Sequence, residues 1–273
     1  MQESTTATEK AGGSLTAAAG DYTLSELMTV QAAREIKDGD VVFVGIGLPN
    51  LACNLARATH APNMVLIYES GAVGAVPDRV PPSIGDPALV TGSLMVCGMP
   101  DIFQLFLQNG KIQIGFLGGA QVDRTGNINT TVIGPYGSPS VRLPGSGGAC
   151  EIATLAQRTL IVARLDKRAF PERVDFVTSP GSRPGGLSRR ELGLPGRGPT
   201  KVITDMGILE PDGASGELIL TSLYPGVNLE QIQAKVGWRL SARDPLREVG
   251  LPTREEIRLL RERLDPKRIH IKE

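Results

Sequence analysis

Two short apolar segments, linked through a glycine turn and a helical segment, constrain the fold of this chain more than any other feature. Residues 41–47, VVFVGIG, predict a strand that enters a glycine turn, and residues 64–69, MVLIYE, predict a second strand. Between them, residues 51–62, LACNLARATHAP, predict a helix that Pro62 ends. This order and spacing are typical of a βαβ unit, whose strands are parallel and covered by helices.

The same alternation continues through the first two-thirds of the chain. Helices are expected over residues 99–110 and 146–156, and strands over residues 112–119, 127–133 and 159–164. The sequence therefore predicts the α/β class. Beyond Ser179 a loop rich in Gly, Pro and Arg leads to strands over 201–226 and to helices over 228–238 and 253–266.

The N-terminal region has a different texture. Residues 1–21 contain no apolar run, so they predict a disordered tail rather than a secretory signal. The first helix is expected within residues 21–40, because Thr23 and Glu26 have capping-box spacing and Gly39 suits a helix end. We expect residues 22–273 to form one domain.

Composition excludes several classes of function. The 29 basic residues balance the 29 acidic ones, which gives no electrostatic reason to expect nucleic-acid or membrane binding. Three widely spaced cysteines suit reduced thiols, and hence the cytoplasm. No cysteine pair has metal-ligand spacing and the two histidines are far apart, so no metal site is expected.

A carboxylate ends the second predicted strand. Glu69 is followed by small residues, which would let a bulky ligand approach the acid. Ligands of α/β proteins bind outside the carboxyl ends of the strands. A merely solvated carboxylate explains the same pattern, and these residues alone leave both interpretations open.

The glycine turn admits a competing interpretation. Gly45 and Gly47 precede a helix, and Glu69 stands where an acid would bind the ribose of a dinucleotide. Asn50, however, occupies the position where the fingerprint needs a third small residue. Pro49 removes an N–H from the place where pyrophosphate would bind. Both departures weigh against a nucleotide site.

Two further clusters suit the stabilisation of an anion. Gly147, Gly148 and Ala149 lead into a helix, so their N–H groups are candidates for an oxyanion cradle. Gly119 and Gln121 follow another strand, and the Gln121 amide could donate to a carbonyl. Tight glycine turns are the alternative for both. Four arginines of the later loop could meet phosphates or simply be solvated: Arg183, Arg189, Arg190 and Arg197.

Taken together, six ordered segments resemble the class I CoA-transferases, and specifically the beta subunits of the glutaconate CoA-transferase type. These segments are VVFVGIGLPNLACNLA, YESGAVGAVPDRVPPSIGD, FLGGAQVDRTGNINTT, LPGSGGACEIATLA, VDFVTSPG and LGLPGRGPTKVITDMGIL. The resemblance implies the class I CoA-transferase fold, an open, mostly parallel sheet with helices on both faces. It also implies an active site shared with a homologous alpha subunit.

The resemblance assigns roles to residues. It makes Glu69 the nucleophile and Gly148 the oxyanion donor, and it places Gln121 near the thioester. The remaining residues expected to contact the substrate or CoA are Gly45, Gly47, Ser70, Gly71, Gly119 and Gly147. The implied reaction moves CoA between an acyl-CoA and a small carboxylic, possibly dicarboxylic, acid through a glutamyl-CoA thioester. CoA is then a substrate, and no permanently bound cofactor is expected.

The chemistry agrees with the residue inventory, because a carboxylate is ionised at neutral pH and attacks without a general base. Two alternatives stay open. One is an acyl-CoA hydrolase, decarboxylase or lyase on the same scaffold, although such relatives tend to lack the motif glutamate. The other is a non-catalytic ligand-binding subunit.

Overall fold

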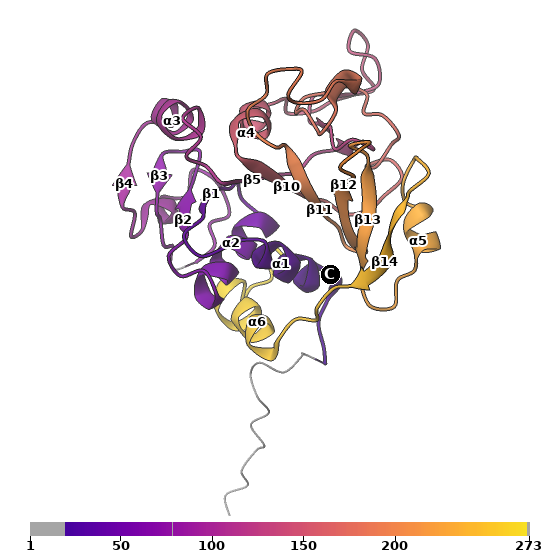
Figure 1. The fold of residues 1–273 in the computed structure, drawn as a ribbon. Helices are drawn as coiled ribbons and strands as arrows, with labels where there is room; N and C mark the ends of the chain where they lie inside the picture. Colours follow the sequence, from indigo (N-terminus) through magenta and orange to yellow (C-terminus); the bar gives the residue numbers. More distant parts are fainter. Residues whose placement is uncertain (1–19, 78, 272–273) are drawn as a thin grey trace, which may run out of the picture.

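The computed structural model describes residues 20–77 and 79–271, so most of the tail expected over residues 1–21 lies outside the described residues (Figure 1). Its centre is a ten-stranded sheet with the strand order β14-β13-β12-β11-β10-β5-β1-β2-β3-β4. The sheet strands are β1 (Val41–Phe43), β2 (Val65–Ile67), β3 (Ala72–Val73), β4 (Met95–Val96), β5 (Ile114–Leu117), β10 (Arg158–Val162), β11 (Pro199–Ile203), β12 (Gly207–Pro211), β13 (Leu218–Leu223) and β14 (Ala242–Glu248). Two small hairpins are formed by β6 (Gln121–Val122) with β7 (Ile128–Asn129), and by β8 (Val132–Ile133) with β9 (Val141–Arg142).

The helical elements precede, separate and follow these strands along the chain. They are α1 (Leu24–Arg34), α2 (Leu48–Thr59), η1 (Pro87–Val90), α3 (Met99–Asp101), η2 (Ile102–Leu107), α4 (Ala149–Leu155), η3 (Pro184–Gly186), α5 (Leu229–Gln233), α6 (Arg254–Leu259) and η4 (Leu260–Leu264). None of the helices in the described part of the chain combines the length and the apolar character that a bilayer crossing requires.

The five central strands, β11-β10-β5-β1-β2, are all parallel, which confirms the βαβ unit predicted from residues 41–69. On one flank β3 is antiparallel to β2 and β4 is antiparallel to β3. On the other flank β12 is antiparallel to β11 and β13 is antiparallel to β12, whereas the edge strand β14 is parallel to β13. Short connections join β2 to β3, β11 to β12 and β12 to β13, and they suit antiparallel pairing because parallel neighbours need a long crossover connection.

Helices cover both faces of the sheet, as the resemblance implies. Successive side chains of a strand point to opposite faces. Along β1 the side chain of Val42 belongs to an apolar cluster that includes residues of α1, α2 and α6, whereas that of Phe43 belongs to a cluster that includes residues of η2, α4 and α5. Two large apolar cores result, one on each face, and a smaller third cluster contains Leu27, Ile208, Tyr224 and Val249. A sheet buried on both faces is typical of parallel α/β proteins.

Several predicted elements differ in detail. The capping box of Thr23 and Glu26 is present, but α1 ends at Arg34, before the Gly39 expected to end it. The strand expected over 127–133 is split into β7 and β8, which belong to different hairpins. The helix expected over 99–110 becomes a short α3 followed by the π-helical η2.

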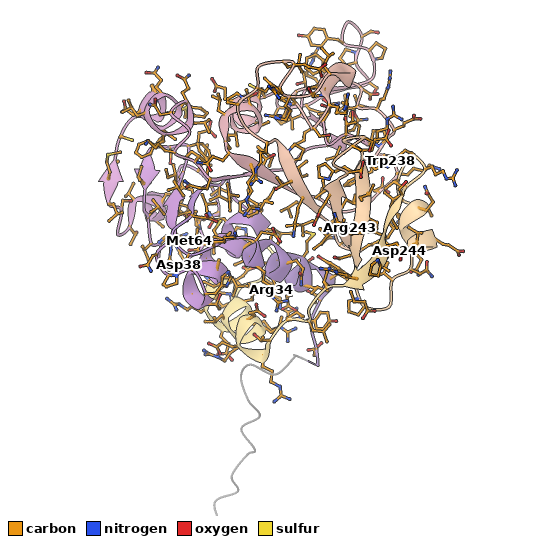
Figure 2. All side chains as sticks on the ribbon, viewed as in Figure 1. Arg34, Asp38, Met64, Trp238, Arg243 and Asp244 are labelled. Carbon is orange, nitrogen blue, oxygen red and sulfur yellow. The ribbon has the colours of Figure 1, made fainter. Side chains whose placement is uncertain are left out.

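Ion pairs join the two ends of the described chain. Arg34 Nη2 lies 2.8 Å from Glu256 Oε2, and Arg261 Nε lies 2.6 Å from the buried Glu26 Oε1. Figure 2 places Arg34 on α1 above α6, with Met64 to one side and Trp238 at the opposite side of the molecule beside α5. The C-terminal helices therefore pack onto the face that α1 and α2 cover.

Candidate functional site

The predicted site residues follow the carboxyl ends of three adjacent strands. The exit of β1 leads to Gly45 and Gly47, that of β2 leads to Glu69, and that of β5 leads to Gly119 and Gln121. Because β2, β1 and β5 are neighbouring parallel strands, their carboxyl ends share one edge of the sheet (Figure 1). This is the edge at which α/β proteins bind ligands.

Glu69 lies on a tight turn between β2 and β3. The N–H of Tyr68 donates to the carbonyl of Ala72 at 2.9 Å, and the N–H of Gly71 donates to the carbonyl of Tyr68 at 3.0 Å. Ser70, next to Glu69 on this turn, is exposed. The turn thus presents both side chains at the sheet edge.

The small residues after Glu69 have a packing reason. Gly71 has φ +113°, and a Cβ there would lie 1.9 Å from the carbonyl oxygen of Cys97 on the neighbouring chain segment. Gly74 has φ +67°, and a Cβ there would lie 2.7 Å from the Leu94 side chain. The backbone turn and the β3–β4 pairing by themselves require glycine at both positions. Access for a ligand is therefore not needed to explain why these two residues are small.

The Glu69 side chain is half-buried, and no hydrogen bond or ion pair to it occurs within residues 20–77 and 79–271. Its Oε1 lies 3.5 Å from the position that a Cβ on Gly148 would occupy. The fold therefore brings Glu69 and Gly148 together from positions far apart in the chain. A carboxylate without a partner at the ligand-binding edge of the sheet is available to react.

Gly148 is the N-cap residue of α4 and is buried. The Ala149 N–H donates to the carbonyl of Ser146 at 3.0 Å, which corrects the expectation that this N–H is free. The Cys150 N–H donates to Ser146 Oγ at 3.3 Å. In the described part of the chain no partner receives the N–H of Gly147 or Gly148, so both remain candidate donors.

Two phenylalanines that the sequence analysis missed complete the environment of Gly148. A Cβ on Gly148 would lie 2.5 Å from Cζ and 2.9 Å from Cε1 of Phe103 in η2. The Phe103 ring packs in turn on Phe43 of β1, with ring centroids 5.7 Å apart and a tilt of 60°. Residues 99–110 predict only a helix, so nothing in the sequence pattern singles out the one ring that meets Gly148.

The glycines predicted to contact the substrate differ in the space around them. Gly45 and Gly47 have open space around them, which suits a ligand. Gly119 is close-packed instead, because a Cβ there would lie 2.3 Å from Cγ2 of Ile128.

The Gln121 side chain is occupied by internal hydrogen bonds. Its Oε1 accepts from Asn129 Nδ2 at 2.7 Å and from the Asp175 N–H at 3.0 Å. Its Nε2 donates to Asp175 Oδ2 at 3.2 Å. The role of Gln121 near the thioester stays a prediction: one amide N–H is engaged by Asp175, and the second N–H is the candidate donor.

A buried polar pair explains the departure from the dinucleotide fingerprint. Asn50 Nδ2 donates to Tyr68 Oη at 3.0 Å, and both side chains are buried. Burial, the largest cause, raises the pKa of Tyr68 to about 12, so the phenol stays protonated and can return a hydrogen bond to Asn50. Asn50 therefore anchors the residue before Glu69, a task that glycine cannot perform.

Arg189 is neither solvated nor directed at an open site. It is 7% exposed, and its guanidinium donates to backbone carbonyls alone. The acceptors are the carbonyl oxygens of Ala153, Thr154, Pro180, Gly181 and Gly196. Since Ala153 and Thr154 lie in the last turn of α4, Arg189 holds the end of the helix that Gly148 begins.

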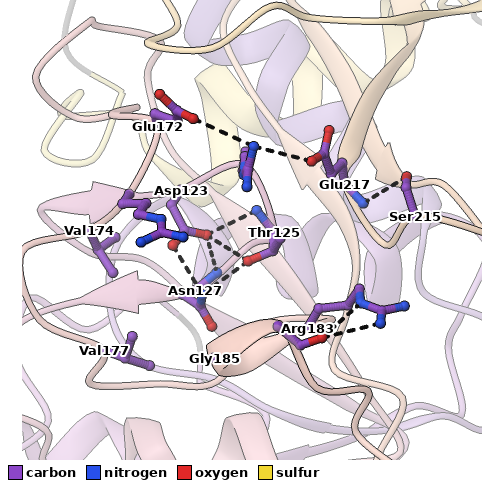
Figure 3. Close-up of a pocket in the computed structure, with 13 residues that line it drawn as sticks. Asp123, Thr125, Asn127, Glu172, Val174, Val177, Arg183, Gly185, Ser215 and Glu217 are labelled. Atoms are coloured by element: carbon purple, nitrogen blue, oxygen red, sulfur yellow. Dashed lines mark hydrogen bonds and ion pairs between the residues drawn. The ribbon is translucent and has the colours of Figure 1, made fainter.

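A separate hollow of about 390 Å³ lies between Asp123, Glu172 and Arg183 and includes neither Glu69 nor Gly148 (Figure 3). Asp123 accepts hydrogen bonds there from Thr125 and Asn127, so this carboxylate is already engaged. Across residues 20–77 and 79–271 no cluster of three or more His, Cys, Asp or Glu side chains could hold a metal ion.

Comparisons with known proteins agree with this geometry. Residues 25–235 match the family model described as Coenzyme A transferase. The chain is 51% identical over 240 residues to the B-subunit of 3-oxoadipate CoA-transferase from Pseudomonas knackmussii, an alignment that covers 88% of this chain and 92% of the relative. It is 38% identical over 253 residues to the B-subunit of glutaconate CoA-transferase from Acidaminococcus fermentans, covering 90% and 94%.

Solved structures agree as well. The crystal structure of glutaconate CoA-transferase from Acidaminococcus fermentans matches with a TM-score of 0.84 and 37% identity, covering 93% of this chain and 98% of that chain. The decarboxylase AibA/AibB matches with a TM-score of 0.79 and 25% identity, covering 90% and 97%. From the family match, the identities and the shared fold, we conclude that the chain belongs to the coenzyme A transferase family.

Proposed function

We propose that this chain is the beta subunit of a heteromeric CoA-transferase and that Glu69 carries its covalent chemistry. The observation that supports this most strongly is the half-buried Glu69 carboxylate, which has no partner in the described residues and lies against Gly148. A carboxylate with no structural task, at the ligand-binding edge of the sheet, is suited to act as a nucleophile.

The proposed reaction proceeds by exchange of acyl groups and needs no proton transfer. A Glu69 oxygen attacks the thioester carbonyl, the C–S bond breaks and CoA leaves as a thiolate. The thiolate then attacks the glutamyl carbonyl of the resulting anhydride, which releases the first acid as a carboxylate and leaves a glutamyl-CoA thioester. The acceptor carboxylate repeats these two steps in reverse order.

Each attack creates a tetrahedral oxyanion beside Gly148. The N–H of Gly148, which has no partner in the described residues, is the candidate donor to this oxyanion. One such donor is typically worth about 3–4 kcal/mol in the transition state. Gly45 and Gly47, which border open space, are the candidate contacts for the acyl group.

The relatives support a dicarboxylic acid as substrate. Both named substrates, 3-oxoadipate and glutaconate, are dicarboxylic acids, and the relatives that carry these names are 51% and 38% identical to this chain. We therefore propose that one acid of the exchange is a small dicarboxylic acid. Coenzyme A enters as a substrate, and we propose that no cofactor is permanently bound.

An alpha subunit is the proposed partner, since the names of both relatives denote one of two kinds of subunit. The edge of the sheet near Glu69 supports this, because β4 is the last strand and its neighbourhood exposes Leu94, Val96 and Leu105 to 78%, 62% and 57%. An apolar sheet edge left open to water favours association with another chain. The three free cysteines agree with a reducing compartment, and we keep the cytoplasm as the proposed location.

Trapping of the intermediate tests the proposal. The chain is co-expressed with its alpha subunit and incubated with succinyl-CoA, glutaryl-CoA or acetyl-CoA without an acceptor acid, and the complex is then treated with borohydride. Borohydride reduces a glutamyl thioester to an alcohol, so mass spectrometry should find the peptide that contains Glu69 modified. Addition of 3-oxoadipate or glutaconate before borohydride should discharge the label.

Two variants serve as controls. Glu69→Gln keeps the shape of the side chain but removes the nucleophile, so it should abolish both label and transfer. Glu151→Gln changes an exposed acid in the first turn of α4 and should leave both intact. A hydrolase or decarboxylase would consume acyl-CoA without a trapped Glu69, and a ligand-binding subunit would lose nothing in Glu69→Gln. Either result overturns the proposal.

A further inference from the structure

We infer that Phe103 is a positioning residue that shields the acylated Glu69 from water, so that its ring sets the ratio of CoA transfer to acyl-CoA hydrolysis. This inference rests on the proposed function, because it assumes that Glu69 becomes acylated.

The ring and the carboxylate share one neighbour. The Cβ position of Gly148 lies 2.5 Å from Phe103 Cζ and 3.5 Å from Glu69 Oε1. Any side chain on residue 148 would collide with the ring, so the ring occupies the space that opens above Gly148. The ring therefore fills space next to the Glu69 carboxylate that water would otherwise occupy.

Two contacts hold the ring in this place. Phe103 packs on the buried Phe43, with centroids 5.7 Å apart in a tilted arrangement, and such aromatic pairs are favourable beyond their buried area. Phe103 is also the second residue of the π-helical η2, where its carbonyl accepts from the Gln108 N–H at 2.9 Å. Single π-helical turns are frequent at functional sites, because the wider turn re-aims a side chain.

The chemistry makes this ring consequential. Glu69 carries an activated acyl carbon in both proposed intermediates, and water competes with the thiolate or the acceptor acid for it. In hydrolysis of the glutamyl-CoA thioester, the oxygen of water attacks the glutamyl carbonyl and the C–S bond breaks. One proton of water goes to the CoA thiolate and the other to solvent, which regenerates the Glu69 carboxylate. A dry site prevents this loss.

The experiment measures both rates on the assembled alpha–beta complex. Transfer is followed with acyl-CoA and an acceptor acid, and hydrolysis is followed as release of free CoA without an acceptor. Phe103→Ala should raise the ratio of hydrolysis to transfer by about tenfold or more, since it opens the space above Gly148 to water. Phe103→Leu keeps most of the apolar volume and should hold the ratio within about threefold of the wild type.

The matched control is Phe106→Ala, which removes the same volume from the same π-helical turn. Phe106 is half-buried like Phe103, but it is absent from the nearest neighbours of Gly148, so its ratio should stay at the wild-type value. The ratio separates shielding from structural damage, because a misfolded fraction lowers both rates equally. If Phe103→Ala does not assemble, Phe103→Val should still raise the ratio by about threefold or more.

The two proposals fail in distinguishable ways. If the wild-type complex shows no trapped Glu69, the covalent mechanism fails and the inference fails with it. If Glu69 is trapped but the ratio in Phe103→Ala or Phe103→Val equals that of Phe106→Ala, the inference alone is refuted.

Discussion

Arg189 offers the sharpest test of how the fold holds α4 in place. Its guanidinium is buried, and no carboxylate in the described residues lies within hydrogen-bond distance of it. Desolvation lowers the pKa of Arg189 to about 10, which still leaves the group charged at neutral pH. Five backbone carbonyls alone therefore balance this charge, and we expect the Arg189→Met variant to be strongly destabilised.

The magnitude follows from what the carbonyls lose. The Thr154 carbonyl keeps a hydrogen bond from the Gly196 N–H at 3.1 Å, but in the described residues the other four carbonyls have only Arg189 as partner. At about 1 kcal/mol for each unsatisfied buried acceptor, the loss is about 4 kcal/mol. The desolvation cost that arginine no longer incurs offsets part of this, so we expect the free energy of unfolding to fall by about 3 kcal/mol.

Urea unfolding of the purified chain measures the effect. Trp238 is the only tryptophan and is buried, so its fluorescence reports on the loss of this core. With a slope of about 2 kcal/mol per molar urea, Arg189→Met should lower the midpoint by about 1.5 M. The urea midpoint of Arg189→Lys should lie between those of the wild type and Arg189→Met, because an ammonium has three donors and lacks the planar fork of a guanidinium.

The neighbouring Arg190 is exposed and provides the control, so Arg190→Met should change the free energy of unfolding by less than about 0.5 kcal/mol. Equal midpoints for the Arg189→Met and Arg190→Met variants would refute the reasoning, since the carbonyls would then be satisfied without the guanidinium.

Three further predictions concern the turn, the oxyanion position and pH. Gly71→Ala should destabilise by more than about 3 kcal/mol, because its Cβ would meet a backbone carbonyl at 1.9 Å, whereas Gly213→Ala has open space and should keep the wild-type melting temperature. Gly148→Ala should lower the free energy of unfolding by about 1–2 kcal/mol, because the new methyl group displaces the Phe103 ring. In the Phe103→Val background the same change should cost less, and urea unfolding of the two single variants and the double variant measures this non-additivity. Burial would raise the pKa of Glu26, but hydrogen bonds from Arg261 and the Thr23 N–H outweigh it and hold the pKa below 4.5. Glu26 therefore stabilises the fold above pH ~4.5 and this contribution is lost as the pH falls through the folded-state value, so the midpoint difference between wild type and Glu26→Gln should shrink on acidification; a constant difference would contradict it.

Much of the fold was predictable from local pattern. The βαβ unit, the capping box of Thr23 and Glu26 and the strand that ends before Glu69 all follow from the spacing of apolar, capping and glycine residues, which acts within one or two turns of chain. The family resemblance, which the comparisons confirm, also rests on short motifs in order along the chain.

The split of residues 127–133 between two hairpins was not predictable. Asn129 ends β7 and its side chain bonds the Val132 carbonyl and Gln121, contacts that depend on where β6 lies. The π-helical turn of η2 was not predictable either, because η2 packs against Phe43 and α4, which are distant in the sequence.

The sequence by itself determined the α/β class, the parallel centre of the sheet and the acid at a strand end, because each depends on residues close together in the chain. Only the tertiary structure decided that Glu69 has no partner in the described residues, that Glu69 and Phe103 both lie next to Gly148, and that Arg189 is buried among carbonyls. These contacts join residues tens of positions apart. Their geometry is set by how helices pack on the sheet, which no local pattern encodes.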